Sequence, residues 1–381
     1  MDKKEYLNYR ILNFSIFFGG GAFFAYVGKY LDSIHFTGTE IGIIISLGAL
    51  ISIFVQPIWG YMSDKTGEYK KILMFLIVML SFLEISLSVF KDFKMAMLMF
   101  FIFYLFNCGM GPIFDTVLST AKYDYGKMRL WGSVGFAVGV FFTGIMIDLT
   151  NIYAIFVVFP MFYVISFYIL RKIDVKGAKP QDNIDYHDIL LLLKNKKYIL
   201  FLLSSFFIMG TMYANNTYFS IFYEKIGGEV AGTGFAFLLF ALSEVPFMSK
   251  SNEIIKRIGS EGALVLAASS FFIRWIVYSL MPSPIIIIAT FFLQGLSIGL
   301  YIVVAINYIK ENTAKERRTM ALALYSVSTG GFSAMFFQFI AGFIYEKYGI
   351  GKSYLLMGIS VLIGIFILIY MHFVEKKRVA G

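Results

Sequence analysis

Charged side chains interrupt the apolar parts of this sequence at a few positions, and four of them form two pairs at matched spacings: Asp115, Arg129, Glu244 and Arg274. Asp115 and Arg129 each lie seven positions from Lys122, and Glu244 and Arg274 each lie fifteen positions from Gly259. In an antiparallel helical hairpin, equal offsets from the turn give equal depth, so each pair can bring opposite charges together. Ionised groups in lipid are costly and mark binding or proton-transfer sites. The spacing predicts two polar sites.

Composition sets the environment of these charges. Of 381 residues, 59% are hydrophobic and 15% are charged, whereas soluble domains average about 45–50% apolar and about 25% charged residues. The chain is therefore predicted to lie in a membrane, which excludes most soluble enzymes. The length suffices for about a dozen spans of about 20 residues with their loops.

Metal and cofactor motifs are missing from the sequence. Cys108 is the single cysteine, and His35, His187 and His372 lack the spacing of a metal site. We find neither a Gly-rich phosphate loop nor a nucleophile elbow. The sequence predicts no enzyme activity, no metal and no cofactor.

Apolar runs of 18 or more residues predict membrane-spanning helices. The basic start is followed by an apolar run without a small-residue cleavage site, so we interpret this run as the first span rather than a signal peptide. The twelve predicted spans are 9–31, 39–62, 71–90, 95–119, 129–149, 151–171, 197–223, 231–250, 262–281, 284–309, 319–345 and 352–374.

Lys and Arg are distributed unevenly over the predicted loops. One alternate set of loops, with both termini, holds 26 of the 33 basic residues, and the other set holds 5. Lys29 and Arg274 fall inside predicted helices. By the positive-inside rule, both termini are predicted to be cytoplasmic. The net charge of +9 thus reflects topology, and we expect no nucleic-acid partner.

One long polar loop divides the spans into six and six. We predict an N-terminal bundle at 1–174, a cytoplasmic linker at 175–196 and a C-terminal bundle at 197–381. Weak internal similarity supports this division, since Lys65-Thr-Gly67 after the second span matches Arg257-Ile-Gly259 after the eighth. Repeated halves are typical of transporters. The predicted fold is all-α, with twelve transmembrane helices in two six-helix bundles.

The loop after the second span reads Gly60-Tyr-Met-Ser-Asp64-Lys65-Thr-Gly67. This resembles the loop signature of the major facilitator superfamily, although Glu68-Tyr69 follows where basic residues are usual. The resemblance implies a gating role for Asp64, Lys65 and Gly67. The alternative is an ordinary charged hairpin on the cytoplasmic side.

Further motifs narrow the resemblance within that superfamily. The lactose permease and phenylpropionate permease group is resembled by Gln56-Pro57-Ile-Trp-Gly, Gly111-Pro112-Ile-Phe-Asp115 and Arg129-Leu-Trp131-Gly. Arg274-Trp275 in the second half looks more like the phenylpropionate permeases. The resemblance implies that Asp115 and Arg129 hold substrate, and that Glu244 and Arg274 serve substrate binding and proton coupling. Alternatively, Arg129 only marks a cytoplasmic helix start, and Glu244 and Arg274 are purely structural.

The tenth predicted helix departs from this group. Lactose permeases carry a His and a Glu there, whereas the matching turn reads Gln294-Gly-Leu-Ser297. Proton transfer would then fall to Glu244, Asp115 or Glu84, or be absent. Glu84 has no charge at matching depth, where Phe101 falls, so it is either protonated and structural or faces a cavity.

Several uncharged side chains complete the predicted site. Asn215 and Asn216 could bind substrate or join helices. Further candidates for substrate contacts are Tyr26, Trp131 and Gln294, although most aromatic rings of such a chain face lipid or the interface.

We therefore predict a monomeric symporter of the cell membrane that imports a small organic solute, such as a sugar or an aromatic acid, with protons. Its partners would be substrate, protons and the lipid bilayer. A proton-coupled exporter of drugs or metabolites is the first alternative. The second is a membrane sensor that binds its ligand without moving it.

Overall fold

A computed structural model of the chain describes residues 3–119, 121, 123, 125–175 and 191–379, without the side chains of 125–127, 316, 319 and 372–379. All regular elements in these ranges are helices, and the predicted all-α class is confirmed. Lys122 and most of the predicted linker lie outside the described residues.

Contacts between residues divide the chain into two compact units. The first unit comprises Met1–Asp182 and Asn216–Leu238, and the second comprises Asn183–Asn215 and Leu239–Gly381. This division differs from the one predicted at the linker, because Asn216–Leu238 groups with the first unit. The predicted bundle boundaries therefore stay a prediction.

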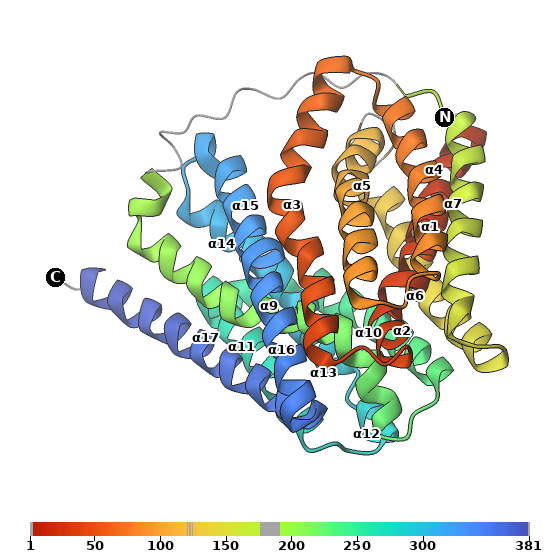
Figure 1. Cartoon of the computed structure of the whole chain (residues 1–381). Coiled ribbons are helices and arrows are strands. Elements are labelled where there is room, and N and C mark those ends of the chain that lie inside the picture. The colour runs from red at the N-terminus through yellow and green to blue at the C-terminus, as the bar shows by residue number, and fades with distance from the viewer. Residues whose placement is uncertain (1–2, 120, 122, 124, 176–190, 380–381) are drawn as a thin grey trace. The chain divides into compact units, whose positions relative to one another are not determined.

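The first unit is built from long helices that pack in pairs (Figure 1). The first helix contacts the sixth and the seventh, the third contacts the fifth, and the fourth contacts the fifth and the seventh. The helices are α1 (Lys3–Phe24), α2 (Val27–Ser33), α3 (Gly38–Thr66), α4 (Tyr69–Leu87), α5 (Phe93–Ser119), α6 (Tyr125–Leu149) and α7 (Ile155–Arg171).

Close packing of α1 against α6 depends on two glycines. A Cβ atom on Gly135 would lie 2.2 Å from the backbone oxygen of Phe14, and one on Gly139 would lie 2.3 Å from that of Phe18. Small residues let two backbones approach in this way when apolar surface alone gives no drive for association in lipid.

The second unit contains helices with irregular turns. Its core contacts join α11 to α14 and α17. Two of its helices are interrupted by π-helical turns, Gly295–Gly299 and Val327–Ser333. The remaining elements, with α9 and α10 shared between the units, are α9 (Lys196–Lys225), α10 (Val230–Ser249), α11 (Ser251–Ser279), α12 (Pro284–Ala289), α13 (Phe292–Gln294), α14 (Leu300–Asn312), α15 (Arg318–Ser326), α16 (Ala334–Tyr348) and α17 (Ile350–Val379).

Twelve helical segments in the described ranges correspond to the twelve predicted spans. Eleven are long and apolar enough to cross a membrane. The twelfth, α4, has 19 residues but carries Lys70, Lys71 and Glu84. The predicted multi-span architecture is confirmed.

Helix ends follow local chemistry. Thr37 and Glu40 form a capping box at the start of α3, and Gly67 ends that helix with φ 66°. In α11, Gly259 has φ 74° and ψ 165°, so it breaks the helix into two segments. Residues 251–261 lie outside the predicted spans and were expected to form a loop, but residues 251–258 form helix between a turn at Lys250 and the Gly259 break.

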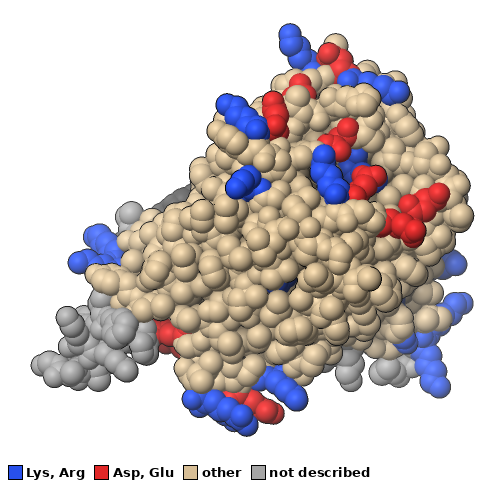
Figure 2. Space-filling view, turned by 90° about the horizontal axis from the view of Figure 1, so that it is seen from below, with Lys and Arg blue, Asp and Glu red and all other residues tan. Residues whose placement is uncertain are grey.

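The surface agrees with a membrane environment. Figure 2 shows charged side chains in a few groups, with broad uncharged areas between them. Large apolar side chains are exposed in both units, including Phe82 at 67% and Phe366 at 63%. Apolar area of this extent is rare on soluble monomers, and lipid contact accounts for it here.

Candidate functional site

A close approach of α10 to the π-helical turn Gly295–Gly299 builds a polar cluster within the second unit. A Cβ on Gly295 would lie 2.1 Å from the backbone oxygen of Ser243, and one on Gly299 would lie 3.0 Å from Cα of Glu244. Glycine is therefore required for this spacing. π-helical turns often occur at functional sites, and this one carries Ser297 and directly follows Gln294.

Glu244 is held by an uncharged partner. The amide Nε2 of Gln294 donates a hydrogen bond to Oε1 of Glu244 over 3.2 Å. Among the described residues, the Glu244 carboxylate forms no ion pair with Arg274 within 4.0 Å. The predicted pair thus forms no direct ion pair, and hydrogen bonds connect its members through Gln294 and Ser297.

Arg274 is 1% exposed and has a partner on one side only. Its Nη1 donates to Oγ of Ser297 over 3.1 Å, and the Ser297 hydroxyl donates to the backbone oxygen of Gln294 over 3.0 Å. Within the described residues, Nη2 of Arg274 has no hydrogen-bond partner. We call Glu244, Arg274, Gln294 and Ser297 the polar cluster.

Aromatic rings surround the guanidinium group of Arg274. Its Cζ lies 4.7 Å from the ring centre of Trp275 and 5.6 Å from those of Phe240 and Tyr278. The Trp275 ring is itself fixed by a hydrogen bond of 2.9 Å from Nε1 to the hydroxyl of Thr211. Cation–π attraction partly offsets the cost of burying this charge.

The charged pair predicted for the first unit has a different setting. The Cζ atom of Arg129 lies 4.1 Å from the ring centre of Phe17. Asp115 is exposed, on α5. Trp131 lies beneath Arg10, whose Cζ is 4.0 Å from its ring centre. Arg129 and Trp131 thus each take part in a cation–π contact in this unit.

Other predicted contact residues are bonded to the protein itself. The Tyr26 hydroxyl donates to the backbone oxygen of Val140 over 2.9 Å, and its ring is fully buried. Asn215 accepts a hydrogen bond from the Tyr354 hydroxyl over 3.0 Å, whereas Asn216 is exposed. Their predicted substrate contacts stay predictions.

Glu84 is the most buried carboxyl of the first unit. It is 0% exposed, and neither carboxyl oxygen has a hydrogen-bond partner within the described part of the chain. Because an ionised carboxylate in such a place would be very costly, the setting favours a neutral side chain.

The predicted gating residues lie at the turn between α3 and α4. Asp64 accepts a hydrogen bond of 2.7 Å from the Tyr69 hydroxyl, and Lys65 lies 5.8 Å from the Tyr61 ring centre. Lys70 donates to the backbone oxygen of Ile173 over 2.6 Å, which ties the start of α4 to the end of α7. Tyr69 and Lys70 were not among the predicted gating residues.

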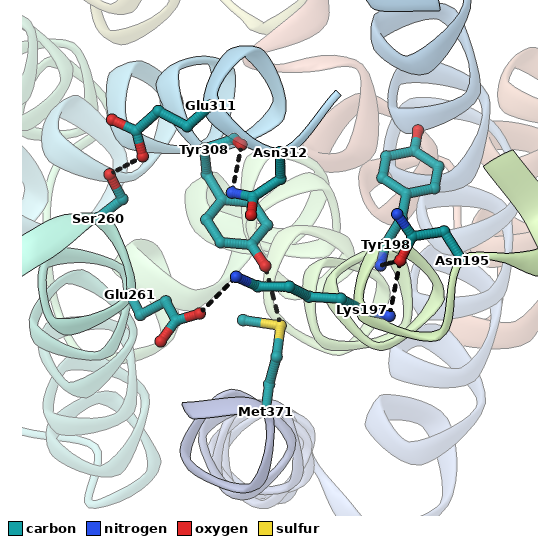
Figure 3. Close-up of polar contacts among 9 residues, drawn as sticks. All are labelled: Asn195, Lys197, Tyr198, Ser260, Glu261, Tyr308, Glu311, Asn312 and Met371. Carbon is teal, nitrogen blue, oxygen red and sulfur yellow. Dashed lines mark hydrogen bonds and ion pairs between the residues drawn. The ribbon is translucent and has the colours of Figure 1, made fainter. Parts of the chain in front are cut away.

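A second set of contacts, which we call the Lys197 cluster, was missed by the sequence analysis (Figure 3). Lys197 Nζ lies 3.3 Å from Oε1 of Glu261, and the Ser260 hydroxyl donates to Glu311 over 2.6 Å. Tyr308 lies beneath Lys197 and bonds to Met371 Sδ. The available signal in the sequence was that Arg257 and Glu261 flank Gly259, in a segment that resembles the turn at Gly67. Their partners lie far away in sequence and could not be chosen from it.

An ion pair in the first unit was also missed. Lys29 Nζ lies 2.5 Å from Oε2 of Glu224, and the two side chains are 10% and 54% exposed. The sequence placed Lys29 inside the first helix but offered no partner at matching depth. The described residues contain no group of three or more His, Cys, Asp or Glu that could hold a metal.

Comparison with known proteins now decides the family. The sequence profile of the MFS_1 like family matches residues 6–376. The chain belongs to this family. The MFS_1 like family comprises transporters rather than enzymes, as predicted, and the predicted resemblance to the lactose and phenylpropionate permease group is confirmed.

Relatives of this MFS_1 like chain are similar along their whole length. An uncharacterized transporter, YwbF, of Bacillus subtilis (strain 168) is 31% identical over 95% of this chain and 92% of its own. The maltose permease of Geobacillus stearothermophilus is 28% identical, with 97% and 94% covered. The probable 3-phenylpropionic acid transporter of Escherichia coli (strain K12) is 26% identical, with 89% and 90% covered.

The fold is also found among solved structures. The nucleoside transporter NupG has a TM-score of 0.86 with 15% identity, covering 98% of this chain and 99% of that one. The likeness confirms the major facilitator fold. The chain is thus a multi-pass membrane protein that transports a small solute.

Proposed function

We propose that this transporter imports a small organic solute together with protons by alternating access. The polar cluster carries the proposal. Glu244 is a carboxyl inside a membrane-spanning helix, and its hydrogen-bond partner is the uncharged amide of Gln294. A carboxyl held in this way can gain or lose a proton without breaking an ion pair. Arg274 supplies the nearby positive charge when Glu244 is ionised.

The substrate is proposed to be a sugar or an aromatic acid. Relatives are named as a maltose permease and a probable 3-phenylpropionic acid transporter, and both solutes offer oxygen acceptors. The Nη2 group of Arg274 is a buried donor without a partner among the described residues. Because an unbonded buried donor costs free energy, a substrate oxygen that accepts from it would gain affinity.

The first unit is proposed to supply Asp115, Arg129 and Trp131 as further substrate contacts. Asp64, Lys65 and Gly67 are proposed to act in gating. We further propose that the protein works as a monomer in the cell membrane, with both termini in the cytoplasm, as the distribution of basic residues favours.

Transport in proteoliposomes tests the proposal. Purified protein is reconstituted, and uptake of labelled maltose and of labelled 3-phenylpropionate is measured with a proton gradient imposed inward, outward or not at all. We expect accumulation of one of them above the outside concentration only with the inward gradient.

Other outcomes select the alternatives. Solute extrusion that requires the inward proton gradient would replace import by export. Saturable binding of a probe without flux under any gradient would favour the sensor. Equal uptake with and without the gradient would contradict proton coupling while leaving transport intact.

A further inference from the structure

We infer that Gln294 and Ser297 are positioning residues that keep Glu244 and Arg274 from forming a direct ion pair. The inference rests on the proposed role of Glu244 in proton transfer. Two neutral residues link the two ionisable ones through hydrogen bonds, from Glu244 to Gln294, then to Ser297 and Arg274. Gln294 and Ser297 thus act through their neighbours, and no direct contact with substrate is assigned to them.

The chemistry of a glutamine amide suits this position. Its Nε2 is a donor and its Oε1 is an acceptor. In the orientation that the structure has, the amide donates to the carboxyl of Glu244, which suits its ionised form, and after a half-turn it can accept from a protonated carboxyl. Because Gln294 does not itself titrate, it can serve both protonation states of Glu244 without changing its own charge.

Ser297 acts on the other member of the pair. Its hydroxyl uses both its functions, since it accepts from Arg274 and donates to the Gln294 backbone. One amino group of the guanidinium is thereby occupied by a neutral acceptor. In surroundings of low dielectric constant a direct pair would be strong and slow to open, which would hold Glu244 in its ionised form.

The π-helical turn sets the geometry. Ser297 within the turn bonds to Arg274 of α11, Gln294 directly before the turn bonds to Glu244 of α10, and Gly295 and Gly299 admit the α10 backbone at contact distance. Arg274 is the charged group that faces Glu244, from α11, and the neutral groups are Gln294 and Ser297. A carboxyl in this position therefore has one charged neighbour and one adjustable neutral partner.

Trp275 offers a readout that needs no substrate. The chain has three tryptophans, and a background with Trp59→Phe and Trp131→Phe keeps only Trp275, which lies 4.7 Å from the Arg274 guanidinium. Its fluorescence is titrated against pH in the whole purified protein. We expect a transition that Glu244→Gln removes, because the charge of Glu244 acts on Arg274 and thereby on the ring.

Substitutions in this background test the two positioning residues. Gln294→Leu and Ser297→Ala are each expected to move the midpoint by roughly half to one pH unit, the effect of one net hydrogen bond. Ser297→Thr keeps the hydroxyl and should restore the original midpoint. Ser243→Ala is the matched control, because Ser243 is equally buried but bonds only to Phe240 of its own helix.

Each result bears on a different claim. A transition that depends on Glu244 but is the same in Gln294→Leu, Ser297→Ala and Ser243→Ala would overturn the positioning roles and leave the proposed function standing. A parent protein without any Glu244-dependent transition would contradict the proton role of Glu244 itself, and the inference would fall with it.

Discussion

The two predicted charge pairs, one in each unit, share the same sequence logic but have different surroundings. Glu244 and Arg274 belong to one hydrogen-bonded cluster with Gln294 and Ser297. Arg129 instead lies over the Phe17 ring, and Asp115 is exposed. Equal depth brings two residues to the same level of a bundle, whereas the facing direction of each helix decides what lies between them.

Neutral polar residues explain the difference. In the second unit, a glycine-lined turn delivers an amide and a hydroxyl to the charged groups. Both arginines lie over aromatic rings, but only Arg274 also bonds to a neutral hydroxyl, that of Ser297. A group bridged by neutral partners can change its protonation at low cost, and a guanidinium over a ring remains a donor for a ligand. This difference supports the proposal that Glu244 in the second unit carries the proton, and that Arg129 in the first unit joins Arg274 in contacting the substrate.

The largest expected effect comes from Glu244→Gln. The amide keeps the size of the side chain but cannot carry a proton, so uptake against a concentration gradient should be abolished. Exchange of labelled for unlabelled substrate across the membrane needs no net proton movement and should persist. Both rates are measured in the same proteoliposomes. Undiminished uphill accumulation in this variant would end the assignment of proton transfer to the second unit.

Arg129→Ala is expected to abolish substrate binding while the fold is retained. Its ring contact contributes about 0.5–1 kcal/mol at exposed sites, so thermal unfolding of the purified variant should change little. Binding is followed by the thermal stabilisation that a saturating probe gives to the parent protein. If the variant were stabilised by the probe as much as the parent, Arg129 would not be a substrate contact.

Arg274→Ala is the matched change in the second unit, and here we expect a large loss of stability, unlike that of Arg129→Ala. Arg274 is fully buried and packs on Trp275, so truncation should lower stability by about 2–5 kcal/mol, as for other large buried side chains. The comparison is sharp because Arg129 is only partly buried. Equal losses of thermal stability in the two variants would show that their settings do not differ as described.

Much of the fold followed from the sequence because lipid imposes strict rules. Helices must satisfy their own backbone in the bilayer, so the apolar runs predicted all twelve segments, including α4 with its three charges. The loop implied between the predicted spans 231–250 and 262–281 was wrong, because residues 251–258 are polar yet still form helix before the Gly259 break. Composition identifies spans, but it says little about helix that continues beyond them.

Less of the candidate site than of the fold could be predicted from the sequence. Offsets from a turn suggested that Glu244 and Arg274 share a level, and Gln294 was singled out as a cavity residue. The bridging by Gln294 and Ser297 depends on a π-helical turn, whose extra residue per turn rotates the following side chains. The partners of Lys29 and Lys197 are far apart in sequence, and no local pattern selects them.

Glu84→Gln should have a small effect, which makes it the control for Glu244→Gln. Glu84 is completely buried, and its carboxyl has no hydrogen-bond partner in the described ranges. A carboxyl that stays neutral is replaced by an amide of the same shape, so we expect a stability change within about 1 kcal/mol and unchanged uphill uptake. Loss of uphill uptake in this variant would move a proton-carrying group into the first unit.

The smallest effect is expected for the direct ion pair between Lys29 and Glu224. Glu224 is 54% exposed, and pairs with a solvated member typically contribute about 0.2–1 kcal/mol. A double-mutant cycle of Lys29→Met and Glu224→Gln, measured by thermal unfolding, isolates the coupling. The same cycle on Glu244→Gln and Arg274→Met should give a larger coupling, because Arg274 is buried, Glu244 is only partly exposed, and the two are joined through Gln294 and Ser297. If the bridged residues were coupled less strongly than the exposed ion pair, the chain of hydrogen bonds would not transmit their interaction, and Glu244 would respond to pH independently of Arg274.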